Sequence, residues 1–489
     1  MPIPLRVSLL LAATITVALA ADYHLAANGD DAHDGRSQAS AWRSLARIPV
    51  GDLRPGDRIV LRSGDRFSGT LALTRGGDPQ QPVTLTRSGA DPAVIMAEPG
   101  RDAVVIAASH VLVSGLQIIG PGCAADGHAD GVRLAATAAN QRLVGVALRD
   151  LRISGFPGYG IQVAADAAGA GCDDLLVEDC EASANGEAGM GSWGPCAPGV
   201  WAHHRITVRG CRFFDQRGLP GKQDNHSGNG IILGDVQGAL IERCSAWGNG
   251  ADCRFPGGGP VGIWLCEADT SVIRDCLSHH NKTGAPSVDG GGFDLDGGCT
   301  NCRIERCLSW RNDGAGYLLC QYQGARAFRD NAIRDCWSVG DGRAHGYAAL
   351  HLWCDPAGSV HDTTVSGCSL VIDATPQGAA CVTLATVADG LRIENNVMVA
   401  LAGAWLLRGG EQAGCTLAGN HWLAHGPAKA CRADQSPSAP PAGTTELAGE
   451  WAIPDTVDLA WLKRLAGVLG GGAGIEPSWG APAVAGERR

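Results

Sequence analysis

Charged residues make up only 18% of this 489-residue chain, and no segment shows a long amphipathic helical stripe. A helical repeat protein would need long segments rich in Ala, Leu, Glu and Lys, so that class is excluded. Basic residues are also in the minority, with 39 Lys and Arg against 50 Asp and Glu. The resulting net charge of −11 argues against a nucleic-acid partner and, more weakly, against an acidic polysaccharide.

Long hydrophobic runs are also lacking, except near the N-terminus. Arg6, the apolar stretch 9–19 and the small residues 18–20 have the order of a secretory signal peptide, so residues 1–21 are expected to be removed on export. The apolar stretch is short for a membrane span, and nothing else in the chain is long enough for one. We therefore predict a monomer that is secreted, periplasmic or at the cell surface, with no membrane span and no nucleic-acid partner.

What the chain does contain is a cysteine repeat. Seven cysteines recur at intervals of 29 to 33 residues, each after a short run that contains Ile or Val. A fixed period of this length indicates one supersecondary unit that is stacked many times. The repeat cysteines are Cys180, Cys211, Cys244, Cys276, Cys307, Cys336 and Cys368.

Each repeat has the composition of one coil of a parallel β-helix. Two short runs that alternate with period two are separated by turns rich in Gly and Asn, in a chain with 70 glycines. Asn396 and Asn420 take the cysteine position in the last coils, where either residue type suits an inward turn. The fold class predicted is all-β, a single-stranded right-handed parallel β-helix with an N-terminal cap and a short C-terminal helical or loose tail.

The predicted boundaries follow the repeat. Residues 22–110 form the N-terminal cap and first coils, and residues 111–431 form the β-helix repeats. Residues 432–489 hold a linker rich in Pro, Ser and Ala, then a helix over 456–469 with Thr456 as its N-cap, and a loose tail.

Three N-terminal segments carry a family resemblance: NGDDAHDG at 28–35, PGDRIVLRSGDRFSG at 55–69 and PVTLTRSGADPAVI at 82–95. They resemble the cap and first coils of secreted right-handed parallel β-helix proteins of the pectate-lyase-like superfamily. The resemblance covers roughly residues 22–425. It implies the fold closely and the activity only loosely, since the superfamily contains many polysaccharide lyases and glycoside hydrolases. It also implies a polysaccharide or oligosaccharide as the partner.

Nineteen cysteines in an exported protein would normally suggest disulfides. Parallel side chains on stacked coils point the same way and present poor bridge geometry. We therefore predict that the seven repeat cysteines are buried thiols that pack as small apolar groups. Three candidate disulfide pairs remain among the other twelve cysteines: Cys299 with Cys302, Cys253 with Cys266, and Cys172 with Cys196. For Cys299 and Cys302 the alternative is two unrelated thiols.

Aligning the second run of each repeat separates inward from outward positions. One bulky inward column is Ile231, Ile263, Phe293, Tyr317 and Tyr347. In this register Asp294 and Asp296 project from the same outer face, about 6.5–7 Å apart along the strand. Trp264 lies beside them, one coil earlier.

Two carboxylates on a rigid outer sheet suit sugar chemistry. One can act as a general acid and the other as a base or nucleophile, and like charges this close raise one pKa. The estimated separation lies near the lower limit for an inverting glycosidase. Trp264 could stack on a sugar ring.

Long polar loops at 216–230, 248–260 and 279–292 flank this face and are predicted to wall a groove, because functional residues concentrate on loops held by a rigid scaffold. The further catalytic candidates are Asp289, Lys282 and His280, and the substrate-binding candidates beside Trp264 are Glu267, Asp224, His226 and Asp313.

Three functions stay open. The leading hypothesis is a glycoside hydrolase that acts on a polysaccharide through Asp294 and Asp296 with help from Asp289. A polysaccharide lyase would instead use Lys282 or His280 as the base, with Ca²⁺ bound by Asp289, Asp294 and Asp296. No other cofactor is indicated. The third candidate is a non-catalytic glycan-binding or structural β-helix, because a fold does not fix a function.

Overall fold

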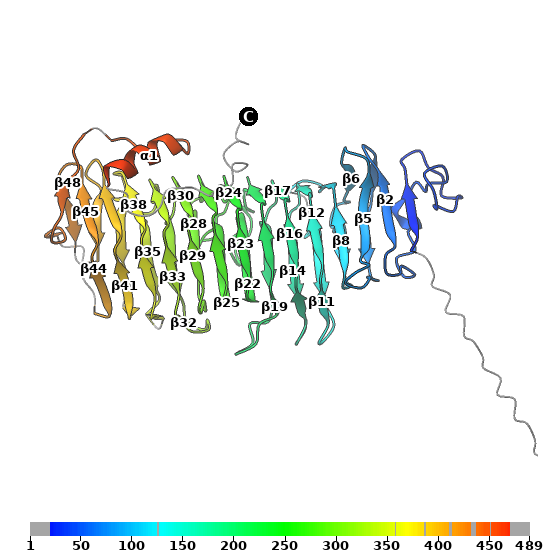
Figure 1. The fold of residues 1–489 in the computed structure, drawn as a ribbon, viewed down its shortest axis with the longest axis horizontal. Helices are drawn as coiled ribbons and strands as arrows, with labels where there is room; N and C mark the ends of the chain where they lie inside the picture. The colour runs from blue at the N-terminus through cyan, green and yellow to red at the C-terminus, as the bar shows by residue number, and fades with distance from the viewer. Residues whose placement is uncertain are drawn as a thin grey trace, which may run out of the picture.

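The computed structural model describes residues 20–124, 127–356, 358–385, 388–409, 413–431, 437–449 and 451–469. The predicted signal peptide up to residue 19, part of the predicted linker and the predicted loose tail from residue 470 lie outside the described residues. The described chain forms a long β-solenoid (Figure 1). No helix in this part of the chain is long and apolar enough to cross a membrane.

The chain coils through three sheets, and the next coil repeats the path. In one coil, β22 (Asn229–Gln237) lies in sheet C, β23 (Leu240–Glu242) in sheet A and β24 (Ser245–Trp247) in sheet B. Sheets A and B each contain 14 strands. β22 pairs in parallel with β25 (Val261–Asp269) of the following coil. The predicted parallel β-helix is therefore confirmed.

The inward column of sheet C is confirmed at four of its five positions. Ile231, Ile263, Phe293 and Tyr317 are all 0% exposed, and the rings of Phe293 and Tyr317 stack with centroids 5.3 Å apart. The fifth position is wrong, because Tyr317 pairs with Leu350 and Tyr347 precedes β35 (Ala348–Cys354). The strand begins with two buried alanines, which leave the alternation ambiguous, so its leucines set the register.

The seven repeat cysteines form a ladder at the turn between sheets A and B. Each is buried and carries a free thiol, as predicted. The backbone N–H of Cys244 donates to Cys276 Sγ of the next coil at 3.4 Å, and Cys244 Sγ donates to Glu242 O at 3.4 Å. The residue before each ladder cysteine has a left-handed backbone, as in Gly210 with φ 64°. Burial raises the pKa of Cys211 well above its ordinary value. At Cys276 and Cys336, hydrogen bonds with neighbouring ladder thiols outweigh burial and lower the pKa, at Cys276 to about 5.

None of the three candidate cysteine pairs is bridged in the structure; all six are free. Cys299 and Cys302 are neighbouring buried thiols that interact without a bridge, and they donate to Leu265 O at 3.4 Å and Ala268 O at 3.5 Å of the preceding coil. Cys253 Sγ lies 3.5 Å from Ser287 Oγ instead of Cys266.

A second buried ladder, made of amides, follows the strands of sheet B. The backbone N–H of Asn249 donates to Asn281 Oδ1 at 3.4 Å, and that of Asn281 donates to Asn312 Oδ1 at 2.9 Å. The ladder ends on Asp341, whose Oδ1 accepts from the backbone and side-chain nitrogens of Asn312 at 2.9 and 2.8 Å. Burial raises the pKa of Asp341 to about 6.

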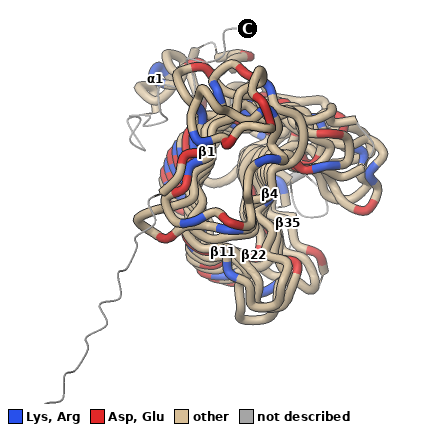
Figure 2. Tube along the Cα trace, turned by 90° about the vertical axis from the view of Figure 1, so that its right-hand side faces the viewer, with Lys and Arg blue, Asp and Glu red and all other residues tan. Residues whose placement is uncertain are grey.

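The outer face of sheet A carries charges that alternate from coil to coil. Arg149, Glu178, Arg209, Glu242 and Arg274 occupy the same register position. Glu242 lies 2.6 Å from both Arg209 and Arg274. Figure 2 shows the stripe of alternating blue and red along this side. Glu242 is only 4% exposed, while Arg209 and Arg274 are 38% and 40% exposed, so the arginines cover its carboxylate and keep the face polar.

The C-terminal segment covers the apolar outer face of sheet B. α1 (Leu459–Val468) packs Trp461 on Trp310, with ring centroids 5.8 Å apart. The helix starts later than predicted, because the carboxylate of Asp458 accepts from the backbone N–H groups of Ala460 and Trp461 at 2.9 and 3.0 Å. Asp458 is therefore the N-cap, and Thr456 is not.

Replacing Asp341 with Asn should stabilise the protein above about pH 6. The folded-state pKa is raised from 3.8 to about 6, so the contribution of this acid to stability is full below the unfolded pKa and is lost as pH rises to about 6. The new amide would continue the ladder by donating to Ser338 Oγ, as Asn312 donates to Ser309 Oγ at 2.9 Å. We expect a gain of roughly 3 kcal/mol at pH 8 and little change at pH 3.5, measured by denaturant unfolding. A loss of stability at pH 8 would show that the ionised acid is the preferred form.

The ladder thiols should resist modification in the native protein. Their burial leaves an alkylating reagent no access to the sulfur atoms in the folded protein. We expect alkylation followed by peptide mass spectrometry to label the seven ladder cysteines only after denaturation. A disulfide between two of them, detected without reductant, would contradict the packing described.

Candidate functional site

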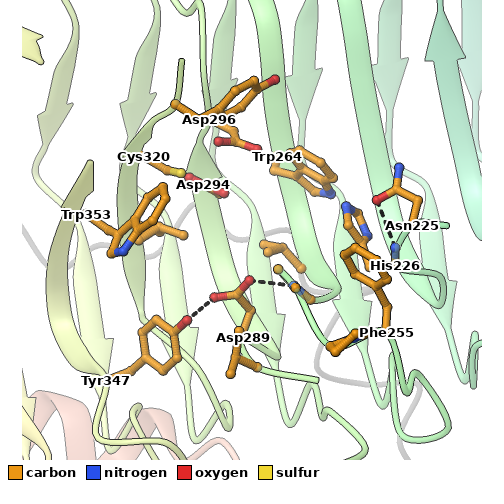
Figure 3. A pocket seen from close by; sticks show the side chains of 18 residues that line it. Asn225, His226, Phe255, Trp264, Asp289, Asp294, Asp296, Cys320, Tyr347 and Trp353 are labelled. Atoms are coloured by element: carbon orange, nitrogen blue, oxygen red, sulfur yellow. Dashed lines mark hydrogen bonds between the residues drawn. The ribbon is translucent and has the colours of Figure 1, made fainter. Parts of the chain in front are cut away.

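A cleft of about 530 Å³ opens on the outer face of sheet C (Figure 3). Its floor is built from β25, β28 (Gly291–Leu295), β31 (Tyr317–Gln321) and β35. All three loops predicted to wall a groove contribute lining residues. The complete lining is Asn225, His226, Phe255, Pro256, Gly257, Gly258, Gly259, Val261, Trp264, Val288, Asp289, Asp294, Asp296, Leu318, Cys320, Tyr322, Tyr347 and Trp353.

Asp294 lies in the middle of the cleft floor, in register with Trp264 on one side and Leu318 on the other. It is only 3% exposed, and its Oδ1 has no hydrogen-bond partner within the described part of the chain. Burial, followed by the charges of Asp296 and Asp289, raises the pKa of Asp294 well above its usual range. Both effects favour the protonated form of this carboxyl, and its Oδ1 is left without a protein partner at the cleft floor.

Asp296 follows directly after the end of β28. Its backbone N–H donates to Leu265 O at 2.9 Å, and its Oδ1 accepts from Gly297 N at 2.7 Å. Burial raises the pKa of Asp296 to about 6, although hydrogen bonds from Cys320 and Gly297 oppose that shift. Two neighbouring carboxyls thus differ in state at neutral pH, one protonated and one ionised, as paired acid–base catalysis requires.

Asp289 is a third carboxyl, and it links the two walls of the cleft. It accepts from Gly259 N at 2.6 Å and from the hydroxyl of Tyr347. Burial raises the pKa of Asp289, while these two hydrogen bonds lower it. Its oxygens are committed to holding the loop at Gly259 and the side chain of Tyr347 in place.

The aromatic residues divide into a buried set and an exposed set. Trp264 is only 3% exposed, and its indole N–H donates to Asn229 Oδ1 at 3.2 Å. It belongs to the floor and offers little ring surface for stacking, contrary to its predicted role. Trp353 and Tyr322 are 42% and 37% exposed and line the same cleft. In Figure 3 the carboxylates of Asp294 and Asp296 lie between Trp264 and Trp353.

His226 lines the cleft, as the loop position suggested. Its Nδ1 lies 3.1 Å from Asn229 Nδ2, and its ring lies 5.5 Å from that of Trp264. Burial and the nearby charge of Lys222 lower the pKa of His226 to about 4. The imidazole is therefore neutral at the pH where Asp296 ionises.

Five of the predicted site residues do not line the cleft. Lys282 Nζ is bound to Asp313 Oδ1 at 3.2 Å, and Glu267 pairs with Arg326 at 3.2 Å. His280 Nε2 lies 2.6 Å from Asp455 O of the C-terminal segment. Asp224 has 84% of its side chain exposed and lies 3.9 Å from Lys222. Membership of a long loop did not determine which way each side chain points.

Sequence reasoning missed Tyr347, Tyr322, Trp353 and Phe255. Trp353 pairs with Cys320, directly after the buried pair of Leu319 and Leu352, so it occupies an outward position of β35. Shifting the last repeat by three residues would therefore have brought Trp353 into the outward column. No comparable signal marked Phe255 or Tyr322, which lie on irregular loops.

No group of three or more His, Cys, Asp or Glu side chains is arranged to hold a metal ion among the residues that the structure describes. The three cleft aspartates do not form such a group, because Asp289 is engaged by Gly259 and Tyr347.

Comparisons with known proteins agree on the fold. A family model described as a right handed beta helix region matches residues 130–333. The structure is similar to a GH136 lacto-N-biosidase from Eubacterium ramulus, with TM-score 0.58 and 16% identity over 82% of this chain and 67% of that chain. The pectate lyase Pel9A aligns with TM-score 0.45 and 14% identity over 84% of this chain and 82% of that chain. No curated protein sequence matches.

Replacing Asp294 with Asn should raise the stability of the protein at pH 8. A carboxyl whose folded pKa is raised contributes its stability below the unfolded pKa, and that contribution is lost as pH rises through the folded pKa. We expect a Tm increase of a few degrees at pH 8 and no change at pH 4, measured by calorimetry. A lower Tm at pH 8 would show that the ionised carboxylate of Asp294 stabilises the fold as a hydrogen-bond acceptor. Asp294 would then not be a functional residue that lowers stability.

Proposed function

The chain is a right-handed parallel β-helix of the kind found in carbohydrate-active proteins, and we propose that it is a glycoside hydrolase with Asp294 as its general acid. The single observation that supports this most is the carboxyl pair. Asp294 is buried, protonated and unpartnered at Oδ1, while the neighbouring Asp296 is ionised at neutral pH. Hydrolysis of a glycosidic bond requires this division of roles.

In the proposed reaction Asp294 donates its proton to the glycosidic oxygen as the bond to the anomeric carbon breaks. Asp296 either takes a proton from an attacking water or attacks the anomeric carbon itself. Asp289 is a positioning residue, since its oxygens hold Gly259 and Tyr347, and its charge raises the pKa of both other aspartates.

The exposed rings of Trp353 and Tyr322 give the substrate a surface for stacking in the same cleft as the carboxyl pair. A GH136 lacto-N-biosidase shares this fold, so the scaffold is compatible with glycoside chemistry. The predicted signal peptide would place the activity outside the cytoplasm, with the mature chain acting as a monomer.

The geometry favours a hydrolase over a polysaccharide lyase. Both bases considered for a lyase lie away from the cleft, Lys282 bound to Asp313 and His280 beside Asp455. A lyase must also neutralise a uronate carboxylate, and the described lining residues include neither Lys nor Arg.

Asp294→Asn and Asp296→Asn should each lower kcat by at least about 10²–10⁴-fold without loss of folding. The wild-type rate should rise with pH as Asp296 ionises, near its pKa of about 6, and fall when Asp294 loses its proton. Product analysis on a polysaccharide panel supplies the assay. Asp341→Asn is the matched control, because it neutralises a buried aspartate that does not line the cleft and should keep full activity.

Full activity in folded Asp294→Asn and Asp296→Asn proteins would rule out the proposed mechanism. Binding of glycans with no product from any of them would favour the non-catalytic alternative.

A further inference from the structure

A second pocket adjoins the cleft on its N-terminal side. It measures about 250 Å³. Its lining is Tyr159, Glu187, Trp193, Lys222, Asn225, His226, Asn229 and Ile232. Asn225 and His226 line both hollows, so the two meet at a shared edge.

The two pockets are arranged along the solenoid axis. Ile232 of the second pocket pairs with Trp264, which pairs with Asp294. Two coil spacings therefore separate Ile232 from Asp294, a distance of about 10 Å. The second pocket extends further, to Trp193 in β18 (Ala188–Trp193) and Tyr159 in β14 (Tyr159–Ala165). A molecule that fills both must run across the strands and be longer than one sugar ring.

The polar groups of the second pocket are already paired and partly buried. Lys222 Nζ lies 2.7 Å from Glu187 Oε1, with side chains 22% and 10% exposed. The hydroxyl of Tyr159 accepts from Trp193 Nε1 at 2.9 Å. A fixed ammonium–carboxylate pair presents several donors and acceptors close together, beside the apolar surface of Ile232 and the indole ring of Trp193. Such a mixture suits the hydroxyls and apolar faces of a sugar.

The charges of the combined groove indicate the substrate class. The cleft contains Asp289, Asp294 and Asp296, and Lys222 is the one Lys or Arg among the described residues that line either pocket. Its charge is matched by Glu187, and His226 is neutral because burial lowers its pKa to about 4. A uronate or sulfate group would lose its hydration here beside carboxyls and find no unpaired cation.

We infer that the substrate is a neutral oligosaccharide chain lying along the solenoid axis, and that the second pocket is a subsite for a sugar residue remote from the bond that is cleaved. This inference rests on the proposed hydrolase function and adds its substrate class and the direction of the chain.

The test compares two double variants. Lys222→Met combined with Glu187→Gln removes the polar pair of the second pocket and keeps its charge balance. Lys282→Met combined with Asp313→Asn removes a similar ion pair, at 3.2 Å, outside both pockets. We expect the first variant to lower kcat/KM about 10–100-fold on long neutral oligosaccharides and to leave the shortest cleaved ones unchanged, and the second to match the wild type.

A binding assay separates this inference from the reaction itself. The Asp294→Asn protein is applied to an array of neutral, uronate-containing and sulfated oligosaccharides of graded length. This readout measures binding and does not depend on whether the variant is active. Binding that is confined to neutral chains, grows with length and is lost when Lys222→Met and Glu187→Gln are added supports the inference. Preference for anionic chains, binding that does not depend on length, or no binding would overturn it. The hydrolase proposal is tested separately: full activity of the folded Asp294→Asn protein would rule it out.

Discussion

The whole structure depends on parallel stacking of one coil on the next. Backbone hydrogen bonds join each strand to its equivalent about 4.8 Å away, so a residue at one position of the coil contacts the same position of its neighbours. A polar residue is favoured where it can stack on its own kind or on an alternating partner. Cysteine and asparagine meet this condition inside, through N–H to side-chain bonds such as that from Cys244 N to Cys276 Sγ. Alternating Arg and Glu meet it outside, on sheet A.

The candidate site is where this rule is broken. Asp294 stacks between Trp264 and Leu318, so its carboxyl has neither a like partner nor an opposite charge. The cost appears in its raised pKa and in its unpartnered Oδ1. The outer carboxylates of sheet A are neutralised by arginine on neighbouring coils, as Glu242 is by Arg209 and Arg274. Those of the cleft are left in a state useful for proton transfer, which is the usual sign of function retained against stability.

Stacking also explains what the sequence could predict. The cysteine period identified the β-helix, its inward columns and the outward position of Asp294, because all three follow from register alone. The register failed at Tyr347, since Ala348 and Ala349 fit either face and removed the alternation. The loops were placed correctly as walls, but the directions of Lys282 and His280 were not, because each is set by a partner on another coil or segment, such as Asp455 for His280. Glu267 lies within β25 and pairs with Arg326. Trp353 was missed because of the same register error, and Tyr322 because it lies on an irregular loop after β31.

The central claim is that Asp294 and Asp296 form the reaction centre of a groove that runs along the axis. It is tested most directly by a crystal structure of the Asp294→Asn protein with the longest neutral oligosaccharide that binds. The account predicts a glycosidic oxygen within hydrogen-bond distance of residue 294 and a chain that extends from Trp353 toward Lys222. An oligosaccharide bound on another face, or one in this cleft with no glycosidic oxygen near residue 294, would contradict it.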